Sequence, residues 1–137
     1  MSASDYLENK ALDHELGVAE NVYALGGRFL ALFTADPTDA NITANEVDVV
    51  VDDTAYARQA ITFGTAVAGE SLNTNAQTFA AVVYGSGAAA YDTTHIGIYD
   101  AVTAGNLLFH APLVATVNRI ATKSMTFEIG TVKVVRG

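Results

Sequence analysis

The stretch THIGIYDAVTAGNLLFHAPL, residues Thr94–Leu113, carries the clearest indication of the fold. Two runs rich in β-branched, aromatic and aliphatic residues, Thr94–Asp100 and Leu107–Leu113, flank a turn-forming segment at Thr103–Asn106. Runs of this kind, separated by a few residues that include glycine, are typical of a β-hairpin. The sequence therefore predicts two long antiparallel strands that pair with each other.

The segments before this hairpin have the composition of short strands. Arg28–Ala35, RFLALFTA, is apolar on both faces and predicts a buried strand that ends at the proline turn Asp36–Asp39. Val47–Val51 is β-branched, and Tyr56–Phe63 alternates between two faces. Val18–Ala24 fits either a first short strand or an extended linker.

A further strand is predicted over Ala76–Tyr84, with Phe79, Ala81 and Val83 on one face. It follows a turn-like segment, Ala68–Asn75, in which small and polar residues prevail. We expect this strand to bury the face that carries the phenylalanine.

The last predicted strand is Ser124–Val135. Its apolar residues up to Ile129 alternate in one phase, and those from Val132 onward are out of phase by one residue. Gly130 lies at the slip, so we expect a β-bulge there. Ala115–Ile120, just before this strand, fits either a short strand or a loop.

About seven to nine short strands with regular turn signals predict an all-β fold, an antiparallel β-sandwich of jelly-roll or Ig-like Greek-key type. One short α-helix is expected at the N-terminus. We expect residues 1–137 to form a single domain, with a helical segment over 1–17 and the sandwich over 18–137.

The N-terminal helix is indicated by its caps. Ser4 or Asp5 is a suitable N-cap, and Gly17 a suitable residue just beyond the C-terminus. A helix this short needs packing to be stable, either on its own sandwich or against a neighbouring subunit. We take its apolar residues as a candidate assembly interface: Leu7, Ala11, Leu12 and Leu16.

The composition argues for a protein that associates with other proteins. Hydrophobic residues make up 50% of the chain and charged residues 16%, which indicates either a well-filled core or a partly apolar surface covered by neighbours. The net charge of −8 disfavours nucleic acid and anionic membranes as partners. The start of the chain is polar and acidic, so we expect no targeting segment.

No catalytic, metal or cofactor site is predicted. The chain contains no cysteine. Asp52 and Asp53 are adjacent and suit a turn better than a carboxylate pair. His14, His95 and His110 match no metal motif, although the last two could face each other across the hairpin. We therefore expect a protein that is not an enzyme and that needs no cofactor.

Tyrosines offer one alternative. Tyr56, Tyr84, Tyr91 and Tyr99 are candidate ligand-facing aromatics, because an array of aromatic rings can stack on sugars. Tyrosines at the ends of a sandwich or at a subunit interface are the competing explanation.

Three segments, in this order and spacing, resemble a family of small tailed-bacteriophage virion proteins that are often labelled tail-fibre proteins. The first is DYLENKALDHELG at Asp5–Gly17, and the third is THIGIYDAVTAGNLLFHAPL at Thr94–Leu113. The second is LALFTADPTDA at Leu30–Ala40, followed by EV and then by YARQAITFG at Tyr56–Gly64. The resemblance implies an all-β virion component without catalytic activity.

Two positions on the particle are compatible with these features. A capsid decoration or cement protein on the outer surface is small, acidic and self-associating, and we expect this role first. The alternative is a tail, tail-fibre or tail-tip component that binds a receptor or glycan. Either protein would be made in the host cytoplasm. Its expected partners are further copies, with a trimer as our expectation, and other virion proteins, the major capsid protein first.

Overall fold

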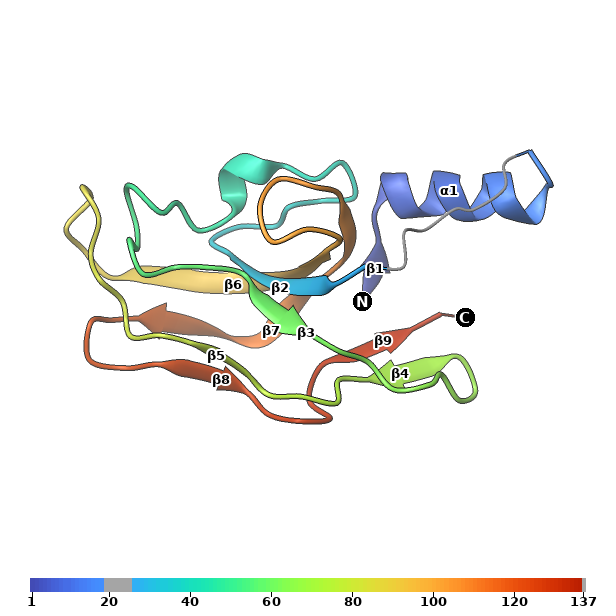
Figure 1. Ribbon diagram of the computed structural model, residues 1–137. Helices are drawn as coiled ribbons and strands as arrows, with labels where there is room; N and C mark the ends of the chain where they lie inside the picture. The colour runs from blue at the N-terminus through green and yellow to red at the C-terminus, as the bar shows by residue number, and fades with distance from the viewer. Residues whose placement is uncertain (19–25, 137) are drawn as a thin grey trace.

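The computed structural model describes residues 1–18 and 26–136 as two layers of antiparallel β-structure with one helix at the side (Figure 1). The predicted all-β sandwich is thereby confirmed. The larger layer is a five-stranded sheet in the order β1-β7-β6-β2-β3. Its strands are β1 (Ser2–Ala3), β7 (Leu107–Arg119), β6 (Tyr91–Tyr99), β2 (Arg28–Phe33) and β3 (Gln59–Ile61).

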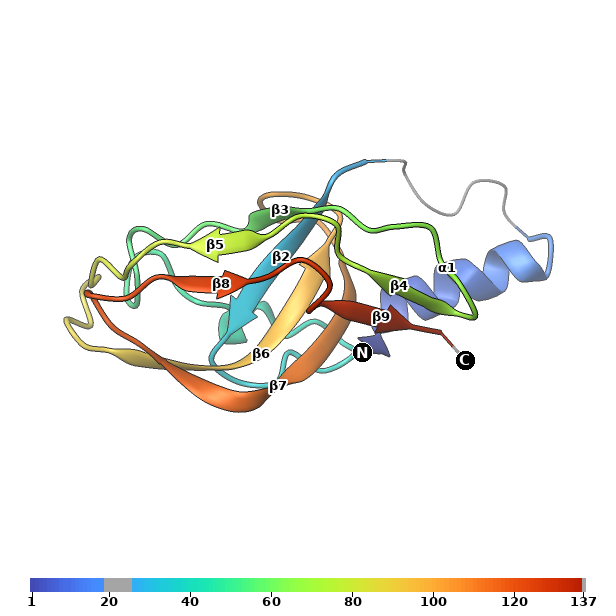
Figure 2. The same ribbon diagram turned by 90° about the horizontal axis from the view of Figure 1, so that it is seen from below.

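The second layer is a long two-stranded ribbon made of two short pairs placed end to end (Figure 2). In one pair β4 (Glu70–Leu72) lies against β9 (Lys133–Val135), and in the other β5 (Gln77–Phe79) lies against β8 (Met125–Phe127). The remaining elements are the helix α1 (Asp5–Glu15) and a 3-10 turn, η1 (Thr43–Asn45).

The predicted hairpin is confirmed, and it is longer than expected. Strands β6 and β7 pair from Tyr91↔Arg119 to Tyr99↔Leu107, with an irregular register next to His95. The segment Ala115–Ile120, which the sequence left between strand and loop, is the end of β7 as far as Arg119. This hairpin provides the two central ladders onto which the rest of the sheet is built.

Strand β2 is buried on both faces, as its sequence predicts. Leu30 and Leu32 face the second layer and belong to the main core. Ala31 and Phe33 point to the other side, where the Phe33 ring stacks on Tyr99 with centroids 6.3 Å apart. A second small core therefore lies on the outer face of the sheet.

Helix α1 begins and ends as its capping residues predict. The Ser4 hydroxyl accepts a hydrogen bond from Leu7 N at 3.3 Å and donates one to the Leu107 carbonyl, which ties the start of the helix to β7. At the other end Gly17 has a φ of 68°, and Val18 N donates to Asp13 O. Beyond its first turns the helix extends past the end of the sheet (Figures 1 and 2).

Two predicted strands upstream of the ribbon are corrected. Val47–Val51 is not a strand, because the Asp48 carboxylate accepts hydrogen bonds from Val50 N and Val51 N and turns the chain. The strand expected over Tyr56–Phe63 shrinks to Gln59–Ile61. Thr34 N donates to Asn45 O and Val47 N donates to Leu32 O, so residues 45–47 occupy part of the edge of β2 along which β3 pairs. Only the first residues of β2 are therefore left to pair with β3.

The ribbon itself also departs from the prediction at one end. Ala68–Asn75 is not turn-like throughout: Ala68 and Gly69 both have positive φ and form a two-residue turn, after which β4 begins. The strand predicted over Ala76–Tyr84 is regular only to Phe79. Val82 is buried in place of Val83, so the expected face does not persist.

The irregularity predicted at Gly130 is present, but it divides the expected last strand into β8 and β9. Between the two pairs the register shifts by one residue, since Glu70 pairs with Val135 and Gln77 with Phe127. The buried Asn73 bridges the gap: its N–H donates to Val132 O at 3.0 Å, and its Oδ1 accepts from Val132 N at 2.9 Å. The strand or linker expected at Val18–Ala24 lies, apart from its first residue, outside the described residues.

Replacing Gly97 with alanine should destabilise the fold. A Cβ at this position in β6 would lie 2.7 Å from both Leu107 Cδ1 and Phe33 Cε2 in the second core. We expect a loss of about 1–3 kcal/mol in the free energy of unfolding, as for other overpacked cores. Gly26→Ala is the control in urea denaturation, because nothing lies within 4 Å of its Cβ. Equal stability of the two variants would contradict this packing.

Candidate assembly surfaces

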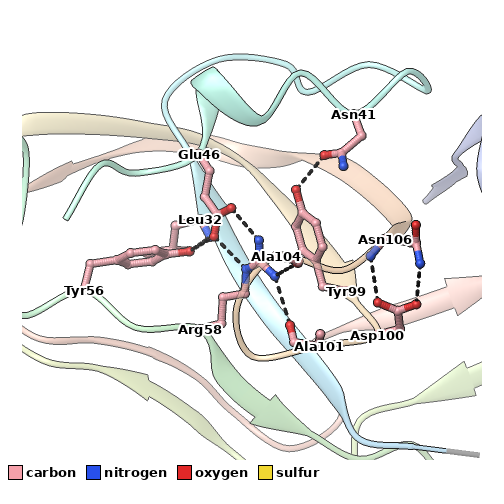
Figure 3. A network of polar contacts seen from close by, with 10 residues as sticks. All are labelled: Leu32, Asn41, Glu46, Tyr56, Arg58, Tyr99, Asp100, Ala101, Ala104 and Asn106. Atoms are coloured by element: carbon pink, nitrogen blue, oxygen red, sulfur yellow. Dashed lines mark hydrogen bonds and ion pairs between the residues drawn. The ribbon is translucent and has the colours of Figure 1, made fainter.

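Arg58, which precedes β3, joins its own segment to Glu46 and to the β6–β7 turn (Figure 3). The Arg58 side chain is only 7% exposed and makes a bidentate contact with Glu46, with N–O distances of 2.8 and 2.7 Å. Its Nη1 donates to the Ala101 and Ala104 carbonyls in the β6–β7 turn. The guanidinium also lies over the Tyr99 ring, with Cζ 3.4 Å from the centroid.

Two tyrosines complete this network. The Tyr56 hydroxyl donates to Glu46 Oε1 at 2.8 Å and accepts from Leu32 N at 3.1 Å. The Tyr99 hydroxyl donates to Asn41 Oδ1 at 2.6 Å. Each polar group is satisfied within the chain, as buried polar groups need to be. The network therefore fixes loops and offers no reactive group.

Above this network lies an open cleft of about 460 Å³. Its lining includes the Glu46–Arg58 pair, Asp48 and several aliphatic side chains, among them Val49, Val50 and Val102. Because Glu46 and Arg58 are bonded to each other and Asp48 accepts hydrogen bonds from its own loop, the cleft suits an apolar side chain better than a sugar or a charged ligand.

A second buried network explains Asp53. This carboxylate is 1% exposed; its Oδ1 accepts from Ala55 N and Val83 N, and its Oδ2 accepts from the Tyr91 hydroxyl at 3.1 Å. The turn expected at Asp52-Asp53 is thus present, and Asp53 anchors it to β6.

The expected tyrosine face is corrected by these contacts. Tyr91 and Tyr99 are buried, and Tyr56 lies in the lining of the cleft. Their hydroxyls bond to Asp53, Asn41 and Glu46, respectively. Tyr84 alone of the four is exposed. The four rings do not form a common surface on which a sugar could stack.

The histidines also have structural partners. His110 Nε2 is hydrogen-bonded to Asp39 Oδ1 at 2.8 Å, and this bond lowers the pKa of Asp39. His110 and His95 both approach Asp36, at 3.6 and 3.9 Å. They do not face each other across the hairpin, as was thought possible, because His95 lies opposite Pro112 and His110 lies opposite Gly97. Within residues 1–18 and 26–136 no group of three or more potential ligands is arranged to hold a metal ion.

A groove runs between α1 and the end of the sandwich. Leu7 and Ala11, two of the four residues predicted for assembly, are buried within the chain and line this groove. Leu12 and Leu16, the other two, are 53% and 69% exposed. The structure therefore divides the predicted interface into a half that holds the helix in place and a half that remains open.

Residues 2–135 match the model of the family described as podophage GP4 fiber I protein gp80. The chain belongs to this family. The match spans nearly the whole chain, and it confirms the resemblance to tailed-phage virion proteins labelled as fibre proteins. No curated protein matches the chain.

Two of the segments that carry the resemblance to the family meet in the structure. The dipeptide Glu46-Val47, the segment Tyr56–Gly64 and the hairpin Thr94–Leu113 supply the ion pair, the tyrosines and the two turn carbonyls of the Arg58 network. Neither Glu46 nor Arg58 was among the site residues predicted from the sequence. The signal in the sequence that could have indicated this pair is a charged residue inside each of two otherwise apolar, strand-like segments.

Of the described residues only 11 form the α-helix, well short of the 18 that a helical membrane span takes.

Removing one partner of the buried ion pair should cost far more than removing one of an exposed pair. Arg58→Met leaves Glu46 buried without a counter-charge, and we expect a loss of about 3–5 kcal/mol in the free energy of unfolding. Arg136→Met is the control, because Arg136 pairs with Glu15 at 3.0 Å where both side chains are 62% exposed, and such pairs contribute about 0–1 kcal/mol. Similar losses for both variants, measured by chemical denaturation, would count against the network.

Alkaline pH should destabilise the protein. Burial raises the pKa of Tyr91 and of Tyr99 to about 12, and it raises that of Tyr56 further. Between the ordinary value of about 10 and about 12 the folded chain holds protons that the unfolded chain releases, so the free energy of unfolding falls as pH rises. Tyrosinate absorbance should appear in a late step that coincides with unfolding. A single titration of every tyrosine near pH 10 with the fold intact would contradict this.

Proposed function

We propose that this chain is a non-enzymatic structural subunit of the tail fibres of a tailed bacteriophage. The observation that carries the proposal is the family match over residues 2–135, since the family is one of fibre proteins. The chain acts through its surfaces: it holds a rigid two-layer body and presents contact areas to other virion proteins.

The buried polar chemistry of the described residues supports a structural role. Arg58 and Glu46 hold the hairpin turn, and Asp53 and Tyr91 hold the loop next to it. None of these four side chains is available for acid–base or nucleophilic catalysis, since each is bonded to other groups of the same chain.

Capsid decoration, our first expectation from size and charge, has less support than the fibre alternative. The acidity and compactness of the chain suit either position, whereas the family description favours the fibre. We therefore rank the tail above the shell, with other virion proteins as partners in both cases.

Attachment to the virion is assigned to the open half of α1. Leu12, Leu16 and Val18 are exposed on the helix and its C-terminal turn, which extend past the sandwich (Figure 1). Glu8 lines the groove beside Leu12, and Glu15 forms an ion pair there with Arg136 at 3.0 Å. A partner surface that is apolar at its centre and polar at its rim would complement this face.

Labelling of intact virions tests the position directly. Gold-conjugated Fab fragments against this chain should mark the tail region in electron micrographs. Fragments against the major capsid protein, which mark the shell, are the control. Label distributed over the shell at the density of the capsid lattice would overturn the fibre assignment.

A charge on α1 should prevent incorporation without unfolding the subunit. Leu16→Asp places a carboxylate at a position where the side chain is 69% exposed, so the stability of the subunit should change little. Docking of α1 onto its partner would, however, have to bury this charge. We expect a loss of most of the subunit from purified particles, measured by immunoblot after complementation. Ile129→Asp is the control, because Ile129 is 65% exposed on the second layer. Full incorporation of Leu16→Asp would contradict the role of α1.

A further inference from the structure

A rigid loop presents exposed valines at the end of the molecule opposite α1. The loop 48–53 and the facing loop 83–90 lie side by side at this end (Figures 1 and 2, green and yellow). Ser86 N donates to Val50 O at 2.8 Å, and Gly87 N donates to Val51 O at 2.9 Å. The two loops are therefore joined by backbone hydrogen bonds and form one unit.

Glycine allows this close contact. A Cβ at Gly85 would collide with the Val50 and Val51 carbonyls, and one at Gly87 would lie 2.9 Å from Val51 O. On the other side of the loop, the Asp48 carboxylate accepts from Val50 N and Val51 N at 2.7 and 2.9 Å. These hydrogen bonds keep the pKa of Asp48 below its ordinary value.

The consequence is an aliphatic surface that the loop cannot fold away. Turning the valine side chains inward would break the hydrogen bonds on both sides of the loop. We call this surface the valine patch. Its four members, Val49, Val50, Val51 and Val102, are between 45% and 65% exposed. Apolar groups held outward in this way mark an interaction site, and their rigidity lowers the ordering cost of binding.

The valine patch combines a ridge with a hollow. Val49, Val50 and Val102 line the cleft over the Glu46–Arg58 pair, and the loop that carries Val50 forms one of its walls. A surface with a ridge beside a cleft of matching chemistry can pair with its own copy, the ridge of each entering the cleft of the other.

We propose that a second copy of this chain occupies the valine patch. The chain carries a net charge of −8, so two copies can meet only where their carboxylates are not forced together. At the patch, Asp48 is turned toward the loop's own N–H groups, and Glu46 is neutralised by Arg58.

Sedimentation velocity over a range of concentrations tests the proposal. The unaltered chain should associate, and Val50→Asp should weaken the association at least about tenfold, since a buried, unpaired carboxylate costs well over 1.4 kcal/mol. Val114→Asp is the matched control, because Val114 is fully exposed on the bulged part of β7. This variant should associate as the unaltered chain does. A chain that is monomeric throughout, or an unchanged Val50→Asp, would overturn the proposal.

Cysteine cross-linking locates the contact independently. The chain has no cysteine, so a single thiol can be introduced cleanly. Ser86→Cys, next to the patch, should give a disulfide-linked dimer when oxidised glutathione is added, and Thr116→Cys, exposed on β7, should not. Equal cross-linking of both variants, or none of Ser86→Cys, would contradict the assignment. Copy–copy contact does not depend on where the virion carries the chain, so these results and the Fab labelling can fail separately.

Discussion

The bidentate contact between Arg58 and Glu46 is the interaction on which the rest of the molecule depends. It lies where β3, the segment after η1 and the β6–β7 turn meet, and it neutralises a cation that would otherwise be buried alone. The planar guanidinium serves all of its partners at once, bonding the carboxylate, two turn carbonyls and the face of Tyr99. The same contact holds the β6–β7 turn and lines the cleft beside the valine patch.

The molecule has two contrasting ends. At one end α1 presents exposed leucines beside Glu8 and the Glu15–Arg136 pair, where we propose that another virion protein docks. At the other end the valine patch presents an aliphatic surface whose neighbouring carboxylates are engaged within the chain. In the ridge-into-cleft contact that we propose, each patch occupies the other, so the contact closes after two copies and leaves α1 of each copy for another virion protein.

The regular elements could be predicted from the sequence because local patterns determine them. The RFLALF strand is apolar on both faces and is buried on both, and Ser4 and Gly17 cap the helix as their chemistry requires. The extra residue at Gly130 followed from the phase of its neighbours. The loops could not be predicted in this way: three valines in a row indicate a strand unless the Asp48 carboxylate is known to turn the chain. The tyrosine face failed for the same reason, since the partners of Tyr91 and Tyr99 are distant in sequence.

A fibre subunit and a coat over the shell differ in how many copies the virion carries. The copy number per virion, measured by quantitative mass spectrometry of purified particles against the major capsid protein, distinguishes the two. A fibre subunit predicts far fewer copies than the capsid protein, in a fixed ratio to the other tail proteins. A number of copies equal to that of the capsid protein would contradict the account and return the chain to the shell.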